Sequence, residues 1–170
     1  MLSSKITRKI INLGPLILLY YLSVSEIDSH FENYFEILSF NIQLIIIYFW
    51  VLKRPEVLGS GHIFFAGLLN DVVMGFPLGI SSLSYLVVCF VGNYVRNKSV
   101  NTTIASDWFT FLIALIFANL LFFSLLNNFS DIAISYAKIG YNTFFTLFLF
   151  PVFWLLFNLY QISFIGSQDA

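Results

Sequence analysis

Six stretches of mainly apolar residues follow one another along the chain, separated by short polar segments. A helix needs about 20 mostly apolar residues to cross the hydrocarbon core of a bilayer, with a range of about 17 to 25. The sequence therefore predicts six membrane-spanning helices, at about 10–25, 37–52, 57–76, 78–95, 108–127 and 141–164. The first two stretches are short, so we expect them to extend into flanking polar residues. The predicted fold is all-α, a polytopic membrane helix bundle that forms one integral membrane domain over residues 1–170.

The third and fourth stretches would form one long apolar run without the segment Gly75-Phe76-Pro77-Leu78-Gly79. Pro77 has no amide hydrogen and restricts the backbone of Phe76, while glycines accept the φ angles of tight turns. We therefore predict two helices joined by a tight hairpin.

The composition and the charges support this count. The chain is 59% hydrophobic and 10% charged, whereas soluble domains have about 25% charged residues. Six crossings put seven basic residues on one side: Lys5, Arg8, Lys9, Lys53, Arg54, Arg96 and Lys98. Only Lys138 lies on the other side, whose first loop contains Glu26, Asp28, His30, Glu32 and Glu36. Because cytoplasmic loops carry an excess of Lys and Arg, we expect both termini in the cytoplasm.

The N-terminal segment loosely resembles a signal peptide, since a basic start and an apolar run precede Ser23-Val24-Ser25. We interpret it as an uncleaved first helix, because no soluble domain that would need export follows it. The single cysteine, Cys89, lies in the fourth stretch. It predicts neither a disulfide framework nor a thiolate metal site.

Asp71 is the one clear ionisable residue inside a predicted span. Such residues are costly in lipid and are functional candidates by default. It lies five residues before Phe76, so about 7 to 8 Å from the outer end of its helix. Two interpretations are open: a carboxylate that contacts a partner or packs between helices, and a carboxylate near the interface that is hydrated or bonded to the turn.

Small residues recur around Asp71 at intervals of four: Gly67, Asp71, Gly75 and Gly79. Up to the turn, this spacing puts the first three on one helical face. Small residues on one stripe let a second helix approach closely within a membrane. We predict that the third helix packs at the centre of the bundle or against a partner.

The remaining polar residues give little support for catalysis. Asparagines and glutamines within the spans can bond between helices, and packing is the expected role of Asn41, Gln43, Asn70, Asn93, Asn119, Asn158 and Gln161. His62 is expected to be an interfacial donor. Two histidines and one cysteine do not make an ordinary zinc site, and no second intramembrane carboxylate pairs with Asp71. We expect a protein that is not an enzyme and that has no cofactor, metal or nucleic-acid partner.

One segment resembles a known family. The resemblance is carried by Arg54-Pro55, then Gly67-Leu68-Leu69-Asn70-Asp71, then Gly75-Phe76-Pro77-Leu78-Gly79. Through these residues the chain resembles the rod shape-determining MreD family, which has a G-L-x-x-D span followed by a G-x-P-L-G turn. The specific part covers about residues 54 to 95, and the other spans match only in hydropathy. The family's positions carry over as Gly67, Asp71, Gly75, Pro77, Leu78 and Gly79, for helix packing or partner binding.

The resemblance implies a non-enzymatic, multi-pass subunit of the bacterial inner membrane that supports cell elongation and peptidoglycan synthesis. Its implied partner is an MreC-like protein and, through it, MreB, RodA and penicillin-binding protein 2. Such a subunit would act as a scaffold that holds its partners in the right geometry.

The alternative is transport. MreD is similar in architecture to the substrate-binding membrane components of energy-coupling-factor vitamin transporters, which typically dock through an alanine-rich motif in their first helix. The first stretch here contains no alanine, and only the acidic first outer loop could act as a ligand lid. We therefore favour the scaffold.

Overall fold

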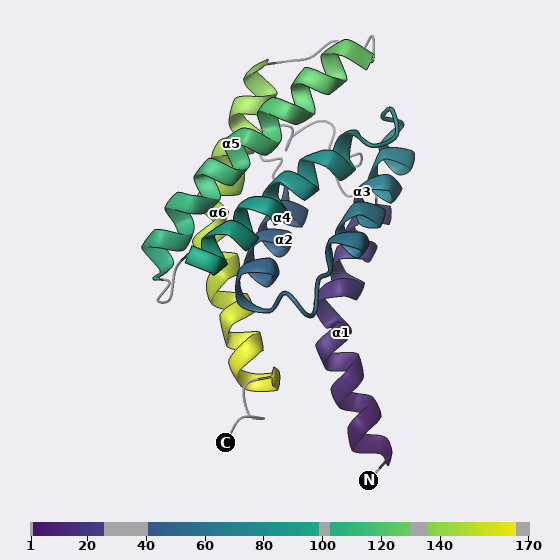
Figure 1. Cartoon of the computed structure of the whole chain (residues 1–170), viewed down its shortest axis with the longest axis vertical. Helices are drawn as coiled ribbons and strands as arrows, with labels where there is room; N and C mark the ends of the chain where they lie inside the picture. Colours follow the sequence, from purple (N-terminus) through teal and green to yellow (C-terminus); the bar gives the residue numbers. More distant parts are fainter. Residues whose placement is uncertain (1, 26–40, 99–102, 130–135, 166–170) are drawn as a thin grey trace, which may run out of the picture.

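The computed structural model describes residues 2–25, 41–98, 103–129 and 136–165, which form helices and their connections (Figure 1). The helices are α1 (Leu2–Val24), α2 (Ile42–Lys53), α3 (Ser60–Met74), α4 (Ile80–Lys98), α5 (Ile104–Phe129) and α6 (Tyr136–Tyr160), followed by a π-helical turn, η2 (Gln161–Ile165). The described residues contain no strand. The all-α prediction is thus confirmed. The acidic first outer loop lies outside the described residues.

The observed helix limits differ from the predicted stretches mainly at their beginnings. α1 begins at Leu2 and so includes the basic N-terminal segment. α2 begins at Ile42, because the side chain of Asn41 accepts a hydrogen bond from the amide of Leu44 (3.2 Å). α5 begins at Ile104, because the hydroxyl of Thr103 accepts a hydrogen bond from the amide of Ser106 (3.3 Å). Asn41 and Thr103 are therefore N-cap residues, a position at which Asn and Thr are preferred.

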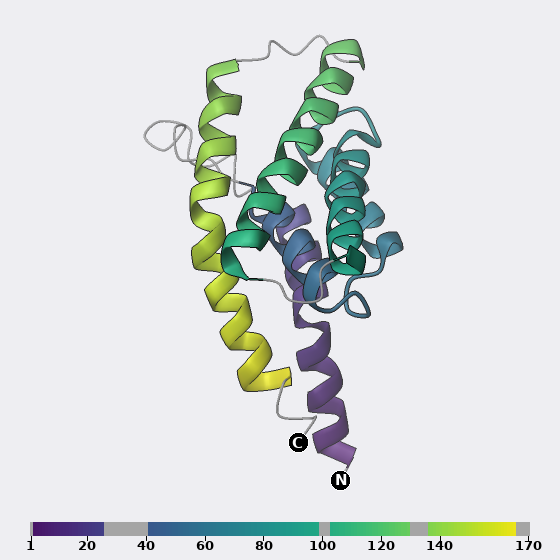
Figure 2. The same cartoon turned by 60° about the vertical axis from the view of Figure 1, so that its left-hand side comes forward.

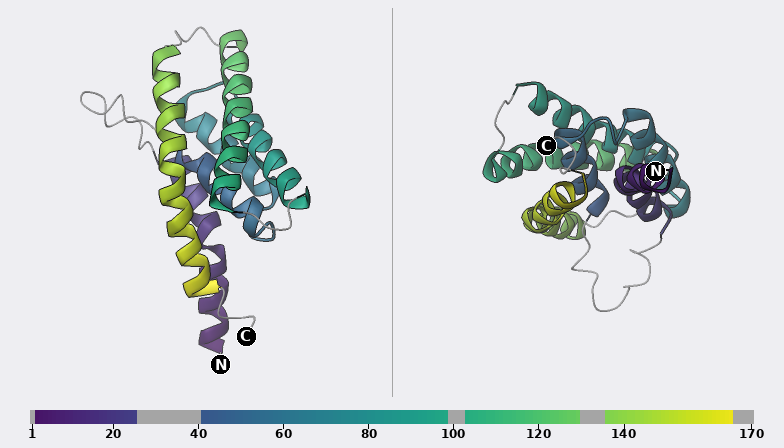
Figure 3. Two further views of the ribbon diagram at one scale, coloured as in Figure 1. Left: turned by 90° about the vertical axis from the view of Figure 1, so that its left-hand side faces the viewer. Right: turned by 90° about the horizontal axis from the view of Figure 1, so that it is seen from below.

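The helices run alternately up and down. Figure 1 shows the start of α1 and the end of η2 at the lower end, on the same side as the α2–α3 connection, the end of α4 and the start of α5. The α3–α4 turn and the upper ends of α5 and α6 lie at the other end (Figures 1 and 2). α1 and α6 extend downward beyond the other helices (Figure 3). This order brings the ends of α2 and α4 to the same side of the molecule as the N-terminus.

The short helix α2 forms the core of the bundle. Its residues from Leu44 to Leu52 are all buried, and it packs against α1, α4 and α6. Tyr48 lies beside Phe111 of α5 and Phe150 of α6, and those two rings stack with their centroids 4.4 Å apart. Aromatic side chains of three helices therefore meet around the middle of α2.

Two of the described helices, α5 and the segment Ile139–Ser163 of α6 and η2, are long and apolar enough to cross a membrane. Only 28% and 17% of the residues in their most apolar windows are buried, so most of these two helices faces outward. Two such helices are consistent with association with a membrane. By contrast, α2 has 12 residues and α3 has 15, and helices of these lengths are about 18 and 22 Å long. Neither matches the roughly 30 Å hydrocarbon core as a straight span. The described helices therefore support two membrane spans and not the six that the sequence predicts.

Candidate functional site

The turn between α3 and α4 is built from the residues that carry the family resemblance. Gly75 ends α3 in the left-handed conformation (φ 67°), and the amide of Phe76 bonds to the carbonyl of Asp71 (2.9 Å). Gly79, just before α4, also has a positive φ (101°). Glycine adopts such angles without a steric penalty. Because a Cβ added at either position would meet nothing within 4 Å, these two glycines serve the backbone of the hairpin, not a close helix contact.

The carboxylate of Asp71 closes the hairpin. Oδ2 accepts a hydrogen bond from the amide of Gly79 (2.7 Å), and Oδ1 accepts one from the amide of Ser81 (2.9 Å). The side chain is fully buried (0% exposed). The first amides of a helix lack intrahelical partners and form the positive end of its dipole. A carboxylate from the end of α3 thus caps the start of α4, and the chain's own backbone occupies both of its oxygens.

Next to Asp71, α3 and α4 approach each other closely. A Cβ added to Gly67 would come within 2.4 Å of the Cα atom of Ser82. Ser82 donates its hydroxyl to the carbonyl of Phe64 (3.0 Å), and Asn70 donates to the hydroxyl of Ser81 (3.0 Å). Gly67 therefore has the role expected for a small residue between membrane helices.

The sequence-predicted site residues divide into two groups by burial. Gly67 and Asp71 lie buried between α3 and α4, and Gly79 and Pro77 are partly exposed beside them. Leu78 points outward with 70% of its side chain exposed. The structure thus brings the polar and small members together and leaves Leu78 at the tip of the hairpin. For Asp71, the geometry combines parts of both interpretations, because the carboxylate is bonded to the turn and is also buried between two helices.

A second buried carboxylate, Asp107, was not recognised from the sequence. Its Oδ2 atom lies 3.3 Å from Nζ of Lys53 and accepts a hydrogen bond from Nε1 of Trp154 (3.0 Å). Asp107 is fully buried, whereas 19% of the Lys53 side chain is exposed. Oδ1 of Asp107 has no hydrogen-bond partner among the described residues. This cluster joins α2, α5 and α6.

The helix dipoles favour both charges of the Lys53–Asp107 pair. Lys53 is in the last turn of α2, and Asp107 is in the first turn of α5. Cations are stabilised at the C-terminal end of a helix and anions at its N-terminal end. The ammonium also lies over the ring of Trp154, 5.5 Å from its centre. From the sequence, Lys53 is predicted only as a cytoplasmic charge, and the fifth span is predicted to begin at about Trp108. The helix-start signal of Thr103 followed by Asp107 in the first turn would have moved that boundary.

A neighbouring contact compensates for a proline in α6. Pro151 lies inside α6 and has no amide hydrogen to give to the carbonyl of Leu147, four residues earlier. Nε1 of Trp108 donates to this carbonyl (2.9 Å). Asp107 and Trp108 therefore both fasten the start of α5 to α6.

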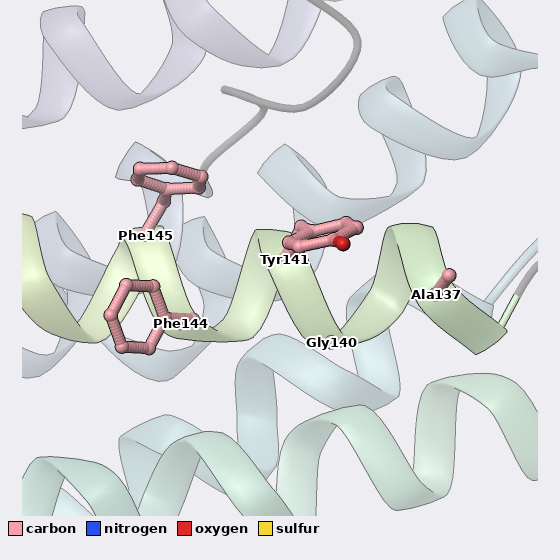
Figure 4. A pocket seen from close by; sticks show the side chains of 5 residues that line it. All are labelled: Ala137, Gly140, Tyr141, Phe144 and Phe145. Atoms are coloured by element: carbon pink, nitrogen blue, oxygen red, sulfur yellow. The ribbon is translucent and has the colours of Figure 1, made fainter.

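The described residues offer little for catalysis or metal binding. They contain no group of three or more His, Cys, Asp or Glu side chains that could hold a metal ion. An open groove on the first half of α6 is lined by Ala137, Gly140, Tyr141, Phe144 and Phe145 (Figure 4). The Tyr141 hydroxyl is its one side-chain polar group, so the groove offers no acid–base pair.

Comparison with protein-family models, curated proteins and solved structures found no match. The resemblance to the MreD family rests on the motif residues alone.

Proposed function

We propose that this chain is a six-span membrane protein, with both termini in the cytoplasm, that acts as a non-enzymatic MreD-like scaffold of the bacterial cell-elongation complex. One observation supports the membrane placement best: many large apolar side chains lie on the outside of the bundle, while several polar and charged side chains are buried inside it beside the apolar core. The buried polar and charged residues are Ser23, Asn70, Asp71, Ser81, Ser82, Ser84, Asp107 and Thr146. Soluble monomers rarely expose large contiguous apolar surfaces.

The outer face of α6 and η2 illustrates the apolar exterior. Exposed apolar residues follow it at helical spacing: Phe144, Phe148, Val152, Leu155, Leu159 and Ile162. Conversely, α4 turns Ser84 inward, where its hydroxyl donates to the carbonyl of Ala118 in α5 (3.0 Å). In a membrane, where lipid removes the hydrophobic driving force, helices associate through hydrogen bonds and close packing.

The shortness of α2 is compatible with six spans because its ends are satisfied inside the protein. The amide of Asn41 donates to the hydroxyl of Thr146 (2.9 Å), and Arg96 donates to the carbonyl of Val51 (3.3 Å). Irregular backbone at membrane depth is tolerated where protein surrounds it. The other helices then separate α2 from lipid.

The scaffold role is supported by the hairpin. Backbone contacts fix the geometry of α3 and α4, and they are made at the positions that resemble the family: Gly67, Asp71, Gly75 and Gly79. They leave Val72 and Leu78 exposed at one end of the pair (65% and 70%). A rigid helix pair of this kind presents a constant surface. We expect an MreC-like protein to bind within the membrane or at the short loops.

The test is depletion of the protein in its own host, with imaging of cell shape and purification of a tagged copy in a gentle detergent. The proposal predicts rounded or swollen cells and co-purification of an MreC-like protein or a wall synthase. Normal shape together with a bound vitamin or an ATP-binding-cassette coupling module would reject it and indicate the transport alternative.

A further inference from the structure

Four basic residues from two distant parts of the sequence gather at one end of the bundle. α2 ends at Lys53 and Arg54, and α4 ends with Arg96 and Lys98 in its last turn. The two ends lie side by side, because Nη1 of Arg96 donates to the carbonyl of Val51 (3.3 Å). This is also the end at which α1 begins and η2 ends (Figure 1).

Only part of this charge is neutralised by the protein. Lys53 is paired with the buried Asp107, and Arg54 is paired with the exposed Glu56 (3.4 Å). These are the two ion pairs of the described residues, and neither includes Arg96 or Lys98. The end of α4 therefore carries two positive charges that no carboxylate of the described chain balances.

The outward face of α4 changes from apolar to cationic over two turns. Phe90 is 71% exposed and Tyr94 is 55% exposed, and Lys98 follows at the same spacing of four. Residues four apart lie on one face of a helix. Nζ of Lys98 lies 5.3 Å from the centre of the Tyr94 ring, so the cation and the phenol are neighbours. Along α4, the Phe90 ring, the Tyr94 phenol and the Lys98 ammonium follow one another in the same order as the acyl chain, the glycerol and the phosphate of a phospholipid.

We propose that this face of α4 binds an anionic phospholipid of the adjacent leaflet. The acyl chain lies along Phe90, and the phosphate group lies beside Lys98. Residues two apart lie on opposite sides of a helix, and Arg96 points toward α2, where it donates to the carbonyl of Val51. Arg96 therefore adds positive charge to this end of α4 without contacting the lipid. Clustered basic residues at the cytoplasmic end of membrane helices attract anionic headgroups. The inference requires that the bundle lies in a bilayer, but not that it binds partner proteins.

The experiment uses the full chain in a neutral detergent. Phosphatidylglycerol and phosphatidylcholine are titrated separately, and bound lipid is counted by native mass spectrometry. We expect tighter binding of phosphatidylglycerol, and about a five-fold loss of its affinity in Lys98→Gln, since one interfacial cation contributes about that factor. Arg96→Gln should show a smaller loss, because its guanidinium points toward α2 on the opposite side of the helix. Lys98 is exposed at the end of its helix, so its variant tests the site even if Arg96→Gln does not fold.

Lys138→Gln is the matched control, because it removes one positive charge from the helix that begins at the opposite end of the bundle (Figure 3). It should leave phosphatidylglycerol binding unchanged. Equal affinity for the two lipids, or an equal loss in Lys138→Gln and Lys98→Gln, would overturn the proposal. Complete displacement of the lipid by millimolar glycerol phosphate would also overturn it, because the apolar part of the site would then contribute nothing.

Discussion

Asp71 and Asp107 are both fully buried, but different groups compensate their charges. Backbone amides at the start of α4 bind both oxygens of Asp71. Asp107 depends on two side chains from other helices, Lys53 and Trp154. The first arrangement is local and fixes a turn, whereas the second joins three helices. Their substitutions should therefore have different consequences.

Asp71→Asn should preserve membrane insertion but lower stability. The amide has one acceptor oxygen, so its NH₂ group would face a backbone N–H, which costs about 1–3 kcal/mol for an unsatisfied buried group. Thermal unfolding in detergent measures this loss. Co-purification with elongation proteins from cells with native expression tests whether Asp71 also contacts a partner. Lost association of a folded variant would indicate direct contact with a partner, and retained association would exclude it.

Lys53→Met should be more destabilising than Asp107→Asn. The first change leaves a buried carboxylate without its cation, at a cost of about 3–5 kcal/mol. The second leaves an ammonium that is already partly exposed (19%) and can reach water. Unfolding of both single variants and of the double variant, under identical conditions, measures the order. A larger loss for Asp107→Asn would contradict this account of the pair.

The sequence was informative for Asp71 and uninformative for Asp107 for a physical reason. Asp71 interrupts an apolar stretch beside glycines, so a local pattern marks it. Asp107 adjoins a polar segment, and its partners Lys53 and Trp154 are distant in sequence. Their proximity depends on how α2, α5 and α6 pack. Likewise, the spacing of Gly67 and Gly75 suggested one packing stripe, but only Gly67 contacts a neighbouring helix.

At the scale of the helix pair, α3 and α4 can approach each other closely because Gly67 has no side chain. Gly67→Ala would place a methyl group 2.4 Å from the Cα atom of Ser82. Overpacking of this kind costs about 1–3 kcal/mol, so we expect a lower melting temperature. Gly140→Ala is the matched control in α6, because its added Cβ meets nothing within 4 Å. A Gly67→Ala variant as stable as this control would show that the helices can separate without cost.

The α5–α6 pair depends on the contact of Trp108 with the carbonyl that Pro151 leaves unpaired. Trp108→Phe should cost about 0.5–1.5 kcal/mol, since the carbonyl of Leu147 loses an exposed hydrogen bond. In a Pro151→Ala background, the amide of residue 151 can bond to Leu147, and the same change should cost less. A double-mutant cycle of unfolding free energies measures this coupling. Equal costs in the two backgrounds would contradict it.

At the scale of the whole molecule, the hydropathy pattern predicted six helices and their alternating directions. It marked the second stretch as short but predicted that this helix would extend into flanking residues, and it did not predict that α2 would lie at the centre. Hydropathy does not distinguish an apolar residue that faces lipid from one that is surrounded by protein. Ile45 and Phe148 both lie in apolar stretches, but Ile45 is fully buried and Phe148 is 65% exposed. Packing, not hydropathy, decides between these environments.

The proposed topology can be measured with single cysteines. The native Cys89 is buried and is replaced by alanine for this experiment. An impermeant maleimide added to spheroplasts should label Leu78→Cys, at the exposed tip of the α3–α4 hairpin. It should label Asn97→Cys, at the other end of α4, only after the membrane is opened. The reverse result would invert the orientation, and labelling of both in intact spheroplasts would contradict a six-span bundle.

The central position of α2 also constrains the order in which the protein can be assembled. Phe49 packs against Trp154 and Phe157, and Trp50 packs against Tyr160. These neighbours lie in α6, which the ribosome makes after α2, α3, α4 and α5. During synthesis, α2 must therefore remain without part of its final surroundings until α6 has emerged. A chain that stops before α6 would expose these aromatic rings, which makes it a natural substrate for membrane quality-control proteases.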